Sequence, residues 1–229
     1  MALYAIGDLH LSLNSNKSME VFGEGWKDYV ERIRDGFANI HDDDVTVLCG
    51  DLSWGMSLEE SLKDFQFINE LPGQKIIIKG NHDYWWNTVS KMEHYFTEHK
   101  LTSIEFLHNN CQFYDTVALC GTRGWFYELD GPSPHNVKML QREVGRLETS
   151  LLAAGNRKKF CFLHYPPLYH GYECPEILQM LEKYNVTACY YGHLHGASHR
   201  LAVNEIRRGI RFSLVSADYL GFIPKKICE

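Results

Sequence analysis

The chain has 229 residues, of which 45% are hydrophobic, and 29 acidic side chains against 23 Lys and Arg give a formal net charge of -6. A chain of this length buries roughly three quarters of its unfolded surface, so it needs no disulfides to stabilise its core. The composition excludes a disordered, collagen-like or disulfide-scaffold protein, and no apolar run approaches the roughly 20 residues of a membrane span. The acidic balance disfavours a general nucleic-acid binder, which carries a basic excess.

Cysteine usage and the N-terminus indicate a cytoplasmic protein. The 7 cysteines are odd in number and widely spaced, and most lie in apolar runs, where a thiol behaves as a small hydrophobe. The first apolar run reaches only Ile6 before Asp8 introduces a charge, which is too short for a signal peptide. We therefore expect reduced cysteines, no secretion signal and no membrane partner.

Short apolar runs recur along the chain and predict strands. They are rich in β-branched and aromatic residues and most end at glycine, which is typical of buried strands. The early strands alternate with helices, which favours right-handed crossovers and a largely parallel sheet. The later runs have fewer helices between them and indicate a second sheet of mixed direction. The predicted strands are 2–6, 45–49, 76–78, 117–120, 160–163 and 188–191.

Apolar residues spaced three and four apart predict helices between these strands. The pattern is clearest over 26–40 and 58–68, and Ser57 with Glu60 forms a capping-box signal before the second helix. By contrast, 126–136 contains glycine and proline and is expected to be an irregular loop. The sequence contains no linker or internal repeat, so we expect one domain over 1–229. The further predicted helices are 88–99, 138–154 and 175–184.

Five of the predicted strand ends carry side chains that bind metal ions. Open α/β sheets place their ligands at the carboxyl ends of strands. Each of these motifs alone is more often an ordinary turn, in which the carboxylate caps backbone amides. Chance does not readily supply all of them together, each at the end of an apolar run. The motifs are Asp8-Leu9-His10, Gly50-Asp51, Gly80-Asn81-His82-Asp83, His164 and Gly192-His193-Leu194-His195.

The chemistry of this set predicts a centre of two divalent metal ions. Carboxylate, imidazole and amide ligands suit Mn, Fe, Zn, Co or Ni, and we favour Mn. A central aspartate has two oxygens and can bridge two ions roughly 3.5–4 Å apart. Two such ions bring four positive charges and Asp8 and Asp51 return two, so about two net positive charges remain to match a phosphate group.

In order, these motifs resemble those of the calcineurin-like metallophosphoesterase superfamily, which are Asp-x-His, Gly-Asp, Gly-Asn-His-Asp/Glu, a single His and Gly-His-x-His. The resemblance spans residues 8 to 195. It implies an α/β fold, a four-layer α-β-β-α sandwich with two mixed sheets. It also implies that Asp8, His10 and His195 hold one metal ion, that Asn81, His164 and His193 hold the other, and that Asp51 bridges them.

The resemblance further implies a mechanism in which a metal-activated water attacks phosphorus in line. His82 is then expected to be the general acid that protonates the leaving group, and an imidazole with an ordinary pKa near 6.5 suits that task. Asp83 or another nearby carboxylate orients His82, or Asp83 is a plain turn residue; the sequence leaves both interpretations open.

The second motif departs from that of the protein Ser/Thr phosphatases, Gly-Asp-x-Val-Asp-Arg-Gly, since residues 50–55 read Gly-Asp-Leu-Ser-Trp-Gly. This departure argues against protein phosphatase activity and favours a small prokaryotic-type phosphohydrolase. Trp54 and Trp85 lie close to the motifs and are candidates either for binding the substrate or for core packing. Arg123, at the end of a strand, either contacts phosphate or pairs with an acidic side chain.

We therefore expect a cytoplasmic, metal-dependent hydrolase of a small phosphomonoester or phosphodiester. A nuclease is the alternative enzyme, and the acidic net charge counts against it. A non-catalytic scaffold of the same fold is the alternative from another class. The presence of every ligand and of His82 counts against the scaffold.

Overall fold

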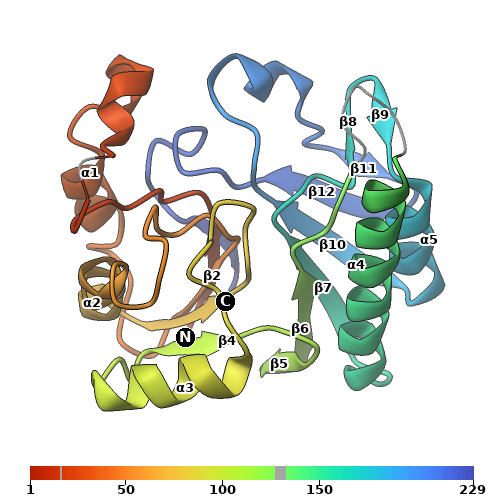
Figure 1. Ribbon diagram of the computed structural model, residues 1–229. Coiled ribbons are helices and arrows are strands. Elements are labelled where there is room, and N and C mark those ends of the chain that lie inside the picture. Colours follow the sequence, from red (N-terminus) through yellow and green to blue (C-terminus); the bar gives the residue numbers. More distant parts are fainter. Residues whose placement is uncertain (16, 127–132) are drawn as a thin grey trace.

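The computed structural model describes residues 1–15, 17–126 and 133–229 and contains two large sheets (Figure 1). In the first sheet β1 to β4 run parallel, as the sequence predicted, and β13 is antiparallel to β1. Because β13 pairs with β1, the two chain termini lie at the same sheet edge. In spatial order the strands are β13 (Lys225–Cys228), β1 (Leu3–Ile6), β2 (Val45–Leu48), β3 (Gln74–Ile77) and β4 (Ile104–Phe106).

The second sheet has mixed direction, also as predicted. Its central strands are parallel, while β5 and β11 pair antiparallel at its two edges. The short strands β8 (Leu168–Tyr169) and β9 (Tyr172–Glu173) form a separate hairpin. In spatial order the second sheet consists of β11 (Ile206–Arg207), β12 (Ile210–Leu214), β10 (Val186–Tyr191), β7 (Lys158–Leu163), β6 (Val117–Thr122) and β5 (Cys111–Tyr114).

Helices cover the outer face of each sheet and complete four layers (Figure 1). The alternation of side chains along β1 shows why. Leu3 and Ala5 pack between the sheets against residues such as Phe162, whereas Ile6 packs against the helices. This is the predicted α-β-β-α sandwich. The first sheet is covered by α1 (Tyr29–Gly36), α2 (Leu62–Glu70) and α3 (Val89–Glu98), and the second by α4 (Pro134–Ala153) and α5 (Pro175–Lys183).

Two helix boundaries differ from prediction for local reasons. The Ser57 hydroxyl accepts the Glu60 N–H at 3.2 Å, but this capping box closes a separate turn, and α2 begins only at Leu62. The prediction of an irregular loop over 126–136 is wrong at its end, because α4 already begins at Pro134. Proline is favoured in the first helical turn, where its missing N–H costs nothing. Residues 127–132 of that predicted loop lie outside the described part of the chain.

The cysteines agree with the expectation of a reduced protein, since every one of them is a free thiol. Among the described residues, we find no helix with both the length and the apolar character that crossing a bilayer requires.

Candidate metal centre

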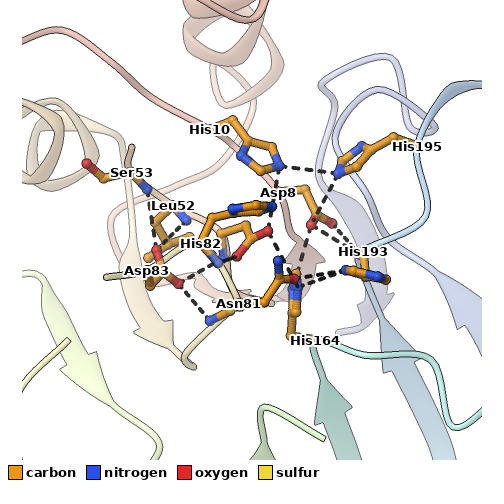
Figure 2. A network of polar contacts seen from close by, with 12 residues as sticks. Asp8, His10, Leu52, Ser53, Asn81, His82, Asp83, His164, His193 and His195 are labelled. Atoms are coloured by element: carbon orange, nitrogen blue, oxygen red, sulfur yellow. Dashed lines mark hydrogen bonds and ion pairs between the residues drawn. The ribbon is translucent and has the colours of Figure 1, made fainter. Parts of the chain in front are cut away.

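All the predicted motifs meet at the carboxyl ends of the two sheets (Figure 2). The strands that carry them run parallel within each sheet, so their carboxyl ends share one edge. Asp8 and His10 follow β1, Asp51 follows β2, Asn81 and His82 follow β3, His164 follows β7, and His193 and His195 follow β10.

Sharp backbone turns aim these side chains into the site. Asp8, His10, Asp51 and His193 adopt positive φ values of 59°, 46°, 52° and 73°. Such conformations cost of order 1–3 kcal/mol for residues with a side chain and cluster at functional sites. The motif glycines make room for the carboxylates. A Cβ at Gly80 would overlap Asp51 Oδ1, and a Cβ at Gly192 would overlap Asp8 Oδ2.

The first predicted ligand set forms a compact group. His10 Nε2 and His195 Nε2 are 3.2 Å apart, and His195 Nε2 is 3.5 Å from Asp8 Oδ1. Asp8 is fully buried and also accepts the backbone N–H of His193 through both carboxylate oxygens. One ligand atom from each of Asp8, His10 and His195 therefore lies within 4.8 Å of the other two.

The second predicted set lies beside the first. Asn81 Oδ1 is 2.5 Å from His164 Nε2 and 2.9 Å from His193 Nδ1. Asp51 Oδ2 lies 3.5 Å from His164 Nε2 and 3.8 Å from His10 Nε2. The Asp51 carboxylate thus reaches a ligand of each set, which is the position that a bridging residue requires.

The donor set fits a pair of cations. Asp8 and Asp51 are buried, and no Lys or Arg in the described part of the chain forms an ion pair with either. Burial, with the neighbouring carboxylates of Asp83 and Asp8, raises the pKa of Asp51 well above its ordinary value. Burial also lowers the pKa of both His164 and His193 to about 3, so these imidazoles are neutral, the form that binds metals. Divalent ions would offset the buried negative charge.

Two of the imidazoles are oriented through their Nδ1 atoms. His164 Nδ1–H donates to the Cys49 carbonyl at 3.1 Å, which leaves Nε2 facing Asn81. His195 Nδ1 lies 3.0 Å from Asp218, which also accepts the Gly196 N–H. Burial lowers the pKa of His195, but Asp8 and Asp218 outweigh it and raise that pKa to about 10.

Asp218 was missed by the sequence reasoning. It stands 23 residues beyond His195, outside every motif, and no local pattern marks it. Metal-binding histidines commonly donate their second N–H to a carboxylate, which fixes the tautomer and the ring orientation. Asp218 occupies that position for His195 and also lies 3.1 Å from His199 Nε2.

Asp83 holds two site loops together instead of orienting His82. Its buried carboxylate accepts the backbone N–H groups of Asp51 at 2.9 Å, Leu52 at 2.8 Å and Gly80 at 2.7 Å. It also accepts the indole N–H of Trp85 at 3.0 Å. Asp83 is therefore neither the partner of His82 nor a plain turn residue, because it fixes the loop that carries Asp51 (Figure 2).

In the described part of the chain, no carboxylate forms a hydrogen bond with the His82 ring. Its backbone N–H donates to Asp51 Oδ1 at 2.7 Å, and its ring lies 4.6 Å from the Trp54 ring. Within the described residues, its buried Nδ1 has no hydrogen-bond partner. Burial lowers its pKa below the ordinary value. The ring faces a cavity of about 380 Å³ next to the ligands.

The three substrate-binding candidates have different surroundings. Trp54 lines the cavity. The prediction that Trp85 binds the substrate is corrected by the structure. Its side chain is fully buried against Phe65 and has no surface with which to touch a substrate. Arg123 pairs with Glu143 at 3.1 Å and does not line the cavity, which agrees with the ion-pair interpretation.

Met19, Phe22 and Trp26 complete the cavity wall, and sequence reasoning did not assign them to the site.

Comparison with known proteins bears on both the motifs and the fold. A family model for calcineurin-like phosphoesterases matches residues 1–197. The fold is similar to phosphopantetheinyl hydrolase from Mycobacterium tuberculosis, with a TM-score of 0.63 and 14% identity over 99% of this chain and 95% of that one. It is also similar to a protein of unknown function from Aquifex aeolicus, with a TM-score of 0.55 and 14% identity over 98% and 95% of the chains. A protein from Thermus thermophilus has a TM-score of 0.57 and 12% identity over 99% and 97%.

These identities are low, so the solved structures show a shared fold alone. No functionally curated protein matches this chain by sequence.

Proposed function

Since the chain belongs to the calcineurin-like phosphoesterase family, whose members are metal-dependent phosphoester hydrolases, we propose that it hydrolyses a small phosphomonoester or phosphodiester at a dinuclear centre. The observation that carries the proposal is the meeting of two buried carboxylates, an amide and four imidazoles beside one cavity. No Lys or Arg in the described chain pairs with either carboxylate, and only imidazoles do, which supports cations as the missing charge.

Each ion has its own ligands in this proposal. Asp8, His10 and His195 hold one ion, and Asn81, His164 and His193 hold the other, with Asp51 between them. When bound, the ions supply Lewis-acid stabilisation of the phosphate oxygens and a water nucleophile at neutral pH. The absence of thiolate from the set supports Mn, Fe, Zn, Co or Ni, and Mn is our first choice.

His82 is the general acid of the proposed reaction. The oxygen of water bonds to phosphorus as the water releases a proton to solvent, the ester P–O bond breaks, and the departing oxygen takes a proton from the His82 ring, which regains one from solvent. The bond from the His82 backbone N–H to Asp51 at 2.7 Å holds the acid in register with the bridging carboxylate.

The alternative functions have less support. None of the cavity-lining residues in the described chain is Lys or Arg, whereas nucleic-acid binding depends on such side chains to contact phosphates. A scaffold without catalysis would not need the complete ligand set or an imidazole such as His82 at the cavity. Free thiols throughout support the proposed cytoplasmic location.

The test is a panel of phosphomonoesters and phosphodiesters assayed with the metal-free protein after loading with Mn, Ni, Co or Zn. Metal content is measured in the same samples. We expect two ions per chain and turnover of at least one ester class. Two bound ions without turnover of any ester would favour the scaffold, and preferential cleavage of RNA or DNA would favour the nuclease.

A further inference from the structure

The cavity beside the metal centre has a lining of two unlike kinds. Its polar residues are ligands or the general acid, namely His10, Asp51, His82, His193 and His195. The rest of the lining is apolar and comes from Trp54, Gly196 and two consecutive 3₁₀ helices. Met19 and Phe22 belong to η1 (Met19–Phe22), and Trp26 belongs to η2 (Glu24–Trp26).

The apolar wall begins directly at the ligands. The Trp54 ring stacks on the His10 ring with centroids 5.1 Å apart and an interplanar angle of 26°. The Trp26 ring stands edge-on to His10 at 5.9 Å and lies 5.6 Å from His195. These rings line the same cavity as the proposed ligands His10 and His195, so a group esterified to a phosphate at the metal centre would enter it beside them.

Phe22 is the exposed part of this wall. Its side chain is 70% exposed although it lines the cavity, whereas Met19 and Trp26 on either side are only 5% exposed. Covering an exposed aromatic ring with an apolar partner is favourable, because it removes apolar surface from water. The ring is thus placed to close over an apolar group that enters the cavity.

Charge and hydrogen bonding restrict what that group is. The cavity lining within the described residues contains no Lys or Arg, and Lys17 lies near it with its ammonium 5.9 Å from the Trp54 ring centroid. A leaving group that carries further phosphate groups would therefore meet no arginine side chain that could bind them. The polar edges of a nucleobase would also lose their water partners without replacement, which is costly.

Size restricts the group further. The cavity measures about 380 Å³, and a cavity of roughly 150 Å³ is enough to hold benzene. Once the phosphate occupies its share, room remains for about one or two rings or an equivalent branched aliphatic group. From these observations we propose that the substrate is a phosphate ester of an uncharged, apolar alcohol or phenol, and that Phe22, Met19, Trp26 and Trp54 bind its leaving group.

This inference rests on the proposed phosphoester hydrolysis and is tested with esters of three primary alcohols. Naphthylmethanol, glycerol and adenosine esterified at its 5′ oxygen are each supplied as the phosphate monoester and as the methyl diester. The departing oxygen is chemically matched across the three, so differences in kcat/KM report the rest of the leaving group. We expect the naphthylmethyl ester to exceed the other two by roughly tenfold to a hundredfold. Equal or better turnover of the glycerol or adenosine ester overturns the proposal.

A matched pair of variants locates the effect. Phe22→Ala removes the exposed ring and is expected to raise KM for the naphthylmethyl ester roughly threefold to tenfold, with KM for the glycerol ester unchanged. Val21→Ala is the control, because Val21 is 81% exposed on the same 3₁₀ helix and does not line the cavity. Equal effects of Phe22→Ala on both esters would show that the ring does not contact the leaving group.

A binding measurement separates failure of this inference from failure of the hydrolysis. Naphthylmethylphosphonate and methylphosphonate cannot be hydrolysed at the P–C bond and are titrated calorimetrically into the metal-loaded protein. We expect the naphthylmethyl compound to bind at least about tenfold more tightly, and Phe22→Ala to reduce the difference. Tighter binding of the naphthylmethyl compound without turnover of any ester would refute the proposed hydrolysis but support the apolar wall as a binding surface. Turnover without any preference for the apolar compounds would refute the wall and retain hydrolysis.

Discussion

The ligand side of the cavity and its apolar wall differ in how the chain holds them. The ligands follow strands buried between two helix layers, and their loops are tied by Asp83 and by the Asp8 carboxylate. Phe22, by contrast, stands on a one-turn 3₁₀ helix with most of its ring in water. In the proposed function, the residues that carry out the reaction therefore follow buried strands, whereas Phe22, which would contact the leaving group, stands on a surface segment. Phe22 is the part of that segment that stands apart from the ligands, whereas Trp26 contacts His10 and His195.

The largest effect is expected from Asp51→Asn, which keeps the shape of the side chain but removes the bridging charge. Both ions should bind more weakly together, and kcat/KM should fall by on the order of a thousandfold, since several kcal/mol of charge stabilisation are lost. Metal content and kcat/KM are measured on the same sample. Asp64→Asn is the control, because Asp64 is another buried carboxylate whose hydrogen bonds run to Ser53 and Leu13 and, in the described chain, to none of the proposed ligands. Loss of a single ion in Asp51→Asn would contradict the bridging position.

His82→Ala should separate acid catalysis from metal binding. The variant is expected to keep two ions and to lose roughly a hundredfold or more in kcat with an alkyl ester, whose leaving group needs a proton. With a nitrophenyl ester, whose leaving group departs as an anion, the loss should be small. Equal losses with both esters would exclude the general-acid role.

Removal of the metals should affect the fold as well as the activity, because Asp8 and Asp51 then stay buried with no Lys or Arg partner in the described chain. A ligand present at a concentration 100 times its Kd stabilises the folded state by about 2.7 kcal/mol. For a chain of this size, this corresponds to a rise in Tm of roughly 5–10 °C. Scanning calorimetry before and after chelation, with Mn added back, measures the shift. An unchanged Tm in chelated, demonstrably metal-free protein would contradict ion binding at the buried carboxylates.

Asp218→Asn should weaken only one of the two ions. Removal of a carboxylate behind a metal-binding histidine typically costs tenfold to a hundredfold in affinity, and only His195 is oriented by Asp218 among the proposed ligands in the described chain. Metal titrations in which the two binding steps are resolved measure the affinity of each ion. His199→Ala is the control, since it removes the other imidazole near Asp218 and leaves the contact with His195. Equal weakening of both steps would show that Asp218 acts through the fold as a whole.

The smallest effect concerns the stability of the wall. Phe22→Ala is expected to change the free energy of unfolding by no more than about 0.5 kcal/mol, as exposed substitutions usually do. Chemical denaturation measures this change. A loss of several kcal/mol would mean that Phe22 supports the fold, and the contrast between wall and ligands would then disappear.

The strands and the motifs that meet at their ends were predictable because their signals are local. A buried parallel strand needs a short apolar run, and a ligand at its end needs a sharp turn, so each motif appears as a contiguous stretch such as residues 45–51. Helix ends were less predictable. The Ser57–Glu60 box closes a turn before α2, and Pro134 starts α4 where loop was expected, since the same residues serve turns and helix starts alike.

The sequence by itself identified the side chains that meet at the proposed metal centre, because ligand chemistry and strand-end position can be read from neighbouring residues. Only the tertiary structure decided which other groups serve them. Asp218 reaches His195 from a later segment, Asp83 turns towards the Asp51 loop and away from the His82 ring, and Phe22 joins Trp54 across the cavity. These contacts join segments far apart in the chain. Their partners are set by how the layers pack, and spacing along the chain does not record that.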